Sequence, residues 1–465
     1  MIKQPVLSLL AAGVLSACSL APTYERPEAP VASTFPTATQ AGDATLTGWR
    51  NFFPDQRLQA LISAALENNR DLRVAALRIE EARAQYGVQS ADLLPNLNVN
   101  AGASRSRTPA ALSPLGVSAV NNSYQVGLGL AAFELDFFGR VRSLNNAALA
   151  QYLASEEAGR AARISLVAEV AKAYLAERAF EEQYELARKT YESRESAYRL
   201  AKQRFDVGAS SALDLRQNET LMQSARVSLA TLARQRAQAA NALTLLVGSP
   251  LADLPAAHGL SEQNIVTEIP AGLPSDLLER RPDIRAAEQR LRAANANIGA
   301  ARAAFFPRIS LTASTGTASN DLSGLFESGS RTWSFVPQLV LPIFDAGRNS
   351  ANLNLADVRR NIAVADYERS IQTAFREVSD ALVGRAAIDE QVDAQRAVLE
   401  AQAERLKLAE LRYQSGVASS LDVLDAQREL FSAQQALVQA RLLRLTNAID
   451  LYRALGGGLV EATGK

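Results

Sequence analysis

The feature that most constrains this chain is an internal duplication. Shifted by 212 positions, residues 67–78 fall on residues 279–290 with five identities, and the match continues without a gap as far as Pro95 and Pro307. An offset of 208 then pairs further identical residues: Gly139 with Gly347, Gly208 with Gly416, Asp214 with Asp422, and Gly248 with Gly456. Self-similarity at a fixed offset is typical of a repeated structural unit. We therefore expect two repeats in a pseudo-twofold arrangement, over residues 58–248 and 275–456, with a connecting segment at 249–274 and a tail at 457–465.

The spacing of proline residues predicts the helices of each repeat. No proline occurs between Pro114 and Pro250 or after Pro342, and a proline inside a helix would cost about 3 kcal/mol. Each proline-free stretch is rich in Ala, Glu, Arg and Leu and is long enough for a helix of about 100 Å. The expected elements are a short helix, a long helix and a return helix in each repeat: 57–92, 140–206 and 213–247, then 275–304, 348–414 and 421–455.

Apolar residues recur every seven positions along the long helices, as at Tyr184, Tyr191 and Tyr198. This period predicts knobs-into-holes packing between helices. A coiled-coil hairpin that serves only as a spacer would show the same period. Within the seam of the return helices we expect Arg236 and Arg444 to pair with neighbouring acids.

Between the short and the long helix of each repeat, the apolar period changes to two. Alternation of this kind predicts strands near 97–104, 124–130, 309–314 and 333–341, with polar loops at 105–122 and 316–331. Such strands match the wall of an outer-membrane barrel, with Trp333 and Phe335 facing lipid, although a soluble sheet is the alternative. Four strands cannot close a barrel, which needs about eight, and lipid does not tolerate open edges. A membrane sheet therefore requires several chains, and two or three copies both remain open.

The composition excludes several classes of site. A single cysteine, Cys18, and a single histidine, His258, leave no thiolate zinc site, disulfide framework or Cys/His nucleophile pair. The 49 basic and 49 acidic residues give no excess of positive charge, which argues against nucleic acid as a partner. We expect no metal, no cofactor and no catalytic residues, and His258 is expected to be a bystander.

The position of Cys18 gives it a role. Residues 1–17 carry Lys3 followed by an apolar core from Val6 to Leu15, as in a secretory signal peptide. Leu15 to Cys18 resembles a bacterial lipobox, in which the cysteine becomes the lipidated first residue; an ordinary signal peptide with an incidental cysteine is the alternative. Residues 18–57, rich in proline, are expected to form a lipidated tether with little regular structure.

Several motifs together resemble the lipoprotein outer-membrane channels of RND-type tripartite multidrug pumps, the OprM branch of the TolC-like family. They are Arg281 to Arg285, Ala303 to Pro307, Tyr367 to Phe375, Arg412 to Gly416 with Leu421 to Arg428, and Leu451 to Gly458. The resemblance implies a homotrimer with a 12-stranded transmembrane β-barrel, four strands from each chain, above a long periplasmic α-helical barrel. It also implies an outer-membrane location and two partners, a periplasmic adaptor protein and an inner-membrane RND transporter.

The same resemblance assigns a periplasmic gate to Leu421, Asp425 and Arg428, near the turn of the second helical hairpin. The i, i+3 spacing of Asp425 and Arg428 allows their side chains to meet. Asp422 and its repeat equivalent Asp214 either add to this gate or cap their helices, and capping with dipole complementarity is the alternative for Asp425 too. Repeat 1 has Gln217 and Thr220 in place of the charged pair, so opening is expected to differ between the two hairpins.

The turns between the long and return helices are either contacts for the adaptor or simply tight turns: Val207, Gly208, Ala209 and Ser210 in repeat 1, and Ser415, Gly416, Val417 and Ala418 in repeat 2. Gly456 to Gly458 lacks the Lys-Ser/Thr of a phosphate-binding loop, so the channel is expected to be passive. The expected cargo is drugs or small amphiphiles. A lipidated coiled-coil scaffold without a pore, or a duct for proteins or metal ions, is the alternative.

Overall fold

A computed structural model describes residues 20–35, 48–112, 116–251, 254–265 and 274–459, so residues 1–17 and Cys18 lie outside the described residues. The chain forms two compact units, and each draws on both repeats. The sheet unit comprises Met1–Glu28, Arg78–Glu156 and Ala286–Glu368. The hairpin unit comprises Ala29–Leu77, Glu157–Arg285 and Arg369–Lys465.

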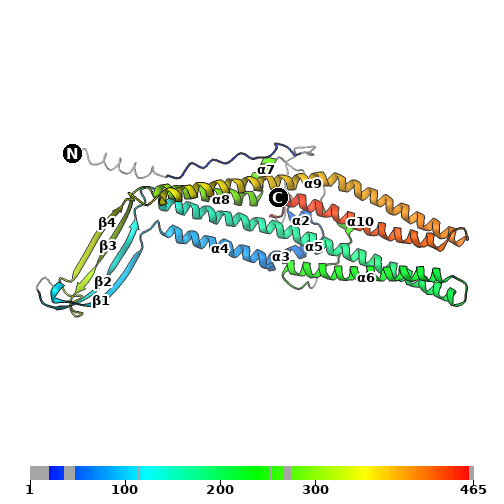
Figure 1. Ribbon diagram of the computed structural model, residues 1–465, viewed down its shortest axis with the longest axis horizontal. Helices are drawn as coiled ribbons and strands as arrows, with labels where there is room; N and C mark the ends of the chain where they lie inside the picture. The colour runs from blue at the N-terminus through cyan, green and yellow to red at the C-terminus, as the bar shows by residue number, and fades with distance from the viewer. Residues whose placement is uncertain (1–19, 36–47, 113–115, 252–253, 266–273, 460–465) are drawn as a thin grey trace. The chain divides into compact units, whose positions relative to one another are not determined.

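The sheet unit contains four antiparallel strands in the order β1-β2-β3-β4 (Figure 1). They are β1 (Leu97–Thr108), β2 (Ala119–Glu134), β3 (Arg308–Ser319) and β4 (Arg331–Val340). The central pairing of β2 with β3 joins the two repeats, with a register shift between Leu130 and Phe133. Apolar side chains remain largely exposed on β4, including Trp333 and Phe335.

All four predicted strands are present, but the predicted loops at 105–122 and 316–331 are too long. The β1–β2 ladder continues through Arg105, opposite Asn122, as far as Thr108, opposite Ala119. These residues are polar and small, as loops often are, but pairing with a neighbouring strand satisfies their backbone groups and extends the sheet.

Two pairs of long helices follow the predicted boundaries closely. The long helices are α5 (Arg140–Asp206) and α9 (Arg348–Gln414), and their return helices are α6 (Ala212–Val247) and α10 (Ser420–Ala454). In the hairpin unit, the second halves of α5 and α9 form helical hairpins with α6 and α10 (Figure 1). Among the described helices, we find none that combines the length and the apolar character needed to cross a membrane.

The predicted short helices are each divided in two. The segment 57–92 forms α3 (Gln56–Asn68) and α4 (Arg70–Ala91), and 275–304 forms α7 (Pro274–Arg280) and α8 (Pro282–Ala303). Asn69 interrupts the first helix because its side chain donates to Leu246 O and accepts from Leu72 N. Pro282 explains the second break, since the residue before a proline avoids helical geometry.

The prediction that residues 18–57 have little regular structure is wrong at its end. A short helix, α2 (Trp49–Phe52), lies in this segment, and Trp49, Phe52 and Phe53 are fully buried. Phe52 stacks on Tyr452 of α10 with ring centroids 3.9 Å apart. The segment therefore supplies large aromatic side chains to the core of the hairpin unit, a role that its proline content concealed.

The beginning of the described chain packs along α8 within the sheet unit. Asn295 donates to Pro22 O at 2.8 Å, and Arg26 forms two hydrogen bonds with Glu288, at 3.1 and 3.0 Å. A Cβ atom at Gly299 would lie 2.7 Å from the Ala21 Cβ. We call residues 20–26 the strap.

Candidate functional site at the helical hairpin tips

Both hairpin turns end their long helix in the same way. Gly208 and Gly416 have φ angles of 75° and 74°, in the left-handed region that glycine adopts without strain. In the first turn the amide of Ala209 donates to Arg204 O and that of Gly208 to Phe205 O; the second turn repeats both bonds. This pair of bonds is the Schellman motif.

The turns also present apolar side chains to solvent within the single chain. Val207 is 79% exposed and Val417 is 71% exposed. Exposed valines at the ends of two hairpins are available for contact with another protein, as the adaptor prediction requires. That contact stays a prediction.

Asp214 and Asp422 each close the first turn of a return helix. Asp214 forms a capping box with Ser211, and Asp422 accepts from the backbone amide of Ser419 at 3.2 Å. The Ser420 hydroxyl also donates to Asp214 at 3.4 Å, which links the two hairpins. The capping interpretation of both aspartates is therefore confirmed, and a place for either in a gate stays a prediction.

Asp425 has a different environment from the two capping aspartates. It accepts from Arg428 at 2.5 Å, as its i, i+3 spacing predicted, and from Arg405 of α9 at 2.6 Å. Arg428 also reaches Glu429 at 3.1 Å. Asp425 thus holds two arginines and ties the two helices of the second hairpin together.

Sequence reasoning missed Arg405. A signal was available, because Arg405 and Asp425 each lie ten residues from Ser415 and therefore face one another across an antiparallel hairpin. The corresponding positions in the first hairpin are Ala197 and Gln217, which cannot form an ion pair.

The predicted gate residues share one cavity of about 370 Å³ between α6 and α10. Leu421, Asp425 and Arg428 line it from the second repeat, and their equivalents line it from the first: Leu213, Gln217 and Thr220. The structure therefore brings the repeat-related triads to one place.

Arginines in the heptad seam pair as predicted. Arg236 forms an ion pair with Glu181, and Arg444 pairs with Asp389 at 2.7 Å. The two pairs occupy equivalent positions of the repeats, which confirms the offset of 208. His258 is exposed and lies 3.3 Å from Glu262. Within the described part of the chain, no group of acidic, histidine or cysteine residues is arranged to hold a metal ion.

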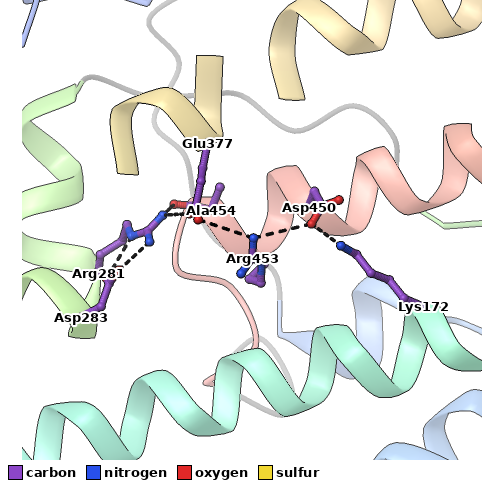
Figure 2. Close-up of polar contacts among 7 residues, drawn as sticks. All are labelled: Lys172, Arg281, Asp283, Glu377, Asp450, Arg453 and Ala454. Carbon is purple, nitrogen blue, oxygen red and sulfur yellow. Dashed lines mark hydrogen bonds and ion pairs between the residues drawn. The ribbon is translucent and has the colours of Figure 1, made fainter. Parts of the chain in front are cut away.

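A second polar cluster joins two of the sequence motifs inside the hairpin unit (Figure 2). Arg281 binds Asp283, Glu377 at 2.7 Å and the carbonyl oxygen of Ala454 at 3.0 Å. Burial acts to lower the pKa of Arg281, but its hydrogen bonds to the two acids outweigh burial and raise the pKa above its ordinary value.

The same cluster extends to α5. Arg453 lies 3.7 Å from both Glu377 and Asp450, and Asp450 pairs with Lys172 (Figure 2). The cluster therefore connects α5, α8, α9 and α10. The sequence marked Arg281 and Arg453 only as parts of motifs, because nothing local shows that the two motifs meet.

Two long helical hairpins, a four-stranded sheet built from both repeats and an ion-paired hairpin tip define the class of TolC-like outer-membrane channels. Solved structures support this assignment. The open state of the Neisseria gonorrhoeae MtrE outer membrane channel matches with a TM-score of 0.88 and 45% identity, covering 96% of this chain and 100% of that one. CusC matches with a TM-score of 0.85 and 43% identity, covering 95% of this chain and 100% of that one.

The chain belongs to the outer membrane efflux protein family, whose model matches residues 61–249 and 273–457. It is 52% identical to the outer membrane protein OprJ of Pseudomonas aeruginosa, over 98% of this chain and 96% of the relative. It is 49% identical to the antibiotic efflux pump outer membrane protein ArpC of Pseudomonas putida, over 99% of this chain and 97% of the relative. The predicted family, fold, function in efflux and outer-membrane location are confirmed.

Proposed function

We propose that this chain forms a homotrimeric exit duct of a tripartite efflux system. In this assembly three copies of the four-stranded sheet close a 12-stranded barrel in the outer membrane. A periplasmic adaptor protein and an inner-membrane RND transporter deliver the cargo. The observation that carries the proposal is the sheet itself, because β1 and β4 leave two open edges and lipid requires every backbone group to be paired.

The proposed cargo is drugs and small apolar or amphiphilic compounds. One relative is named as an antibiotic efflux pump protein, and another, 49% identical over 99% of this chain, as a toluene efflux pump protein. The mature chain would retain one methionine, Met222, one histidine and one cysteine. This scarcity of soft ligands disfavours a metal-ion duct with binding sites of its own.

The proposed gate is the Asp425 cluster with Leu421, and the proposed adaptor contacts are the turns 207–210 and 415–418. The Asp425 pairs tie α9 to α10 and would keep the tip narrow at rest. The duct is proposed to be passive, with no cofactor beyond a covalent lipid on Cys18. The lipid is supported by the position of this cysteine directly after a signal-like segment.

Two experiments test the assembly and its cargo. Native mass spectrometry of the purified protein should show three copies, and a stable monomer or dimer would contradict the barrel. Deletion of the gene should increase susceptibility to a panel of antibiotics and solvents. Sensitivity confined to metal salts, or loss of a secreted protein without drug sensitivity, would instead support one of the other cargoes.

A further inference from the structure

A buried arginine next to the cavity between α6 and α10 forms no ion pair with an acid among the residues that the structure describes. Arg194 of α5 is 7% exposed, and its Nη1 atom donates to the carbonyl oxygen of Leu221 at 3.2 Å. Its Nε and Nη2 atoms are buried and find no hydrogen-bond partner among the described residues. A buried cation in this state is strongly unfavourable unless something compensates its charge.

The fold does not require this arginine. The equivalent position of repeat 2 is occupied by Gln402, whose side chain accepts a hydrogen bond from Arg405 at 3.4 Å. The second hairpin therefore accommodates a neutral side chain at the same place. Repeat 1 therefore carries a positive charge at a position where the packing of the helices does not require one.

Arg194 is connected to the cavity through Leu221 and Arg428. Leu221 lines the cavity and also accepts the Arg194 hydrogen bond. Burial lowers the pKa of Arg194, and the positive charge of Arg428, another lining residue, lowers it further. A negative charge in this cavity would relieve the repulsion between the two arginines.

The other cations of the cavity already have acids. Arg216 pairs with Glu219 at 2.5 Å, and Arg428 pairs with Asp425 and Glu429. Arg194 does not itself line the cavity, but it adds a positive charge behind Leu221 that pairs with no acid among the described residues. Four leucines form the apolar part of the lining: Leu213, Leu221, Leu421 and Leu424. At about 370 Å³, the cavity is within the range of about 300–1,000 Å³ that is typical of small-molecule sites.

We infer that this cavity is a binding site for a small amphiphilic monoanion, with its head group at Arg428 and its alkyl part against the leucines. Arg194 attracts the head group from behind Leu221. The chemical class is an alkyl carboxylate or alkyl sulfate. The inference does not depend on the proposed gate, because binding can be measured without ion conduction.

Octanoate is a suitable probe, titrated calorimetrically into the full-length protein in nonionic detergent, with the heat of a protein-free micelle titration subtracted. We expect saturable binding at one site per chain. Arg194→Gln should weaken it about tenfold or more, because a charge-assisted attraction is lost. Arg188→Gln removes the same charge from the same helix, where Arg188 is exposed and paired with Glu185 and Glu192, and should leave the affinity within about twofold.

A second variant tests the same inference if Arg194→Gln fails to fold. Gln217 lines the cavity at the position equivalent to Asp425, so the fold accepts an acid there. Gln217→Glu should weaken octanoate binding to the same extent as Arg194→Gln, by repelling the anion. Octyltrimethylammonium, which has an alkyl chain one carbon longer and the opposite charge, should show no saturable binding. Equal octanoate affinity for wild type and both variants, no saturable octanoate binding, or saturable binding of the cation would overturn the inference.

Discussion

At the tip of the second hairpin, one carboxylate holds two guanidinium groups from different helices. Without the negative charge of Asp425, Arg405 and Arg428 would repel one another. Asp425→Asn preserves the shape of the side chain, and we expect it to raise the ion conductance of purified channels in planar lipid bilayers several-fold. Exposed ion pairs are worth about 0.2–1 kcal/mol each, so Arg405→Gln, which breaks one pair, should have a smaller effect in the same direction.

A matched control variant distinguishes the proposed role of Asp425 in the gate from the role of Asp422 in capping its helix. Asp422 lies one turn before Asp425 and accepts from the amide of Ser419, the N-cap residue, at 3.2 Å. Asp422→Asn removes a charge but keeps a side-chain oxygen that can accept from the Ser419 amide, so conductance should not change if Asp422 only caps the helix and should rise if it belongs to the gate. If conductance stayed at the wild-type value in both Asp425→Asn and Arg405→Gln, the gate assignment would be wrong.

At the scale of single residues, the sequence predicts contacts within one helix better than contacts between helices. The pair formed by Asp425 and Arg428 follows from helical spacing alone. Arg405 depends on the register of the hairpin, and the bonds of Arg281 to Glu377 and Ala454 depend on tertiary packing. The equal spacing of Arg405 and Asp425 about Ser415 does indicate that register, whereas the contacts of Arg281 leave no local signal in the sequence.

At the scale of elements, the strap packs against Gly299 of α8, whereas the repeat-equivalent glycine of α4, Gly87, has open space beside it. A methyl group at Gly299 would meet Ala21 and Ser143 at 2.7 Å, whereas one at Gly87, its equivalent in α4, would meet nothing within 4 Å. We expect Gly299→Ala to displace the strap and expose the Tyr24–Glu25 bond to chymotrypsin. Gly87→Ala should leave the digestion unchanged and stabilise the protein by about 0.5–1 kcal/mol. Equal digestion of both variants would show that the strap is not held by this close contact.

Asp55, the N-cap residue of α3, predicts that the stability of the protein depends on pH. Asp55 accepts from Gln263 at 2.7 Å, from the Tyr174 hydroxyl at 2.9 Å and from two amides of its helix. Burial alone would raise the pKa of Asp55, but these hydrogen bonds lower it below its usual value. The stabilisation is therefore complete above the unfolded pKa of about 3.9 and is lost as the pH falls through that value toward the folded pKa.

Urea unfolding of wild type and Asp55→Asn between pH 7 and pH 3 measures this contribution. At pH 7 the variant should be less stable by about 1.5–3 kcal/mol, the value of hydrogen bonds to a charged group. The difference between the two proteins should shrink as the pH falls toward 3. A difference that stays constant over this range would mean that Asp55 does not contribute through its charge.

The sequence predicts the ends of a helix well where a helix-favouring composition coincides with a stretch free of proline, as in 140–206 and 348–414. The breaks at Asn69 and before Pro282 were missed for different reasons. Pro282 is a local signal that the helical period concealed. Asn69 breaks its helix through a bond to Leu246, which the sequence does not reveal.

At the scale of the whole molecule, the alternation of apolar residues predicted four strands but not their order. The pairing of β2 with β3 places residues nearly 200 positions apart side by side, as Tyr124 lies opposite Ser319. The repeat made such a pairing plausible without specifying it, because strand order depends on how the two repeats pack. The number of chains in a closed barrel is likewise decided by contacts between copies.

Barrel closure can be tested with two neighbouring residues of β4. Phe335 is exposed on the apolar face, whereas the Ser334 hydroxyl points to the other face and bonds to Ser314 at 2.7 Å. An arginine on the lipid face costs about 2–4 kcal/mol at the membrane midplane, and a trimer would carry three copies. Phe335→Arg should therefore abolish the heat-modifiable trimer in outer-membrane fractions, while Ser334→Arg, facing the lumen, should retain it. If both variants assembled equally well, β4 would not face lipid, and the barrel proposed here would have to be abandoned.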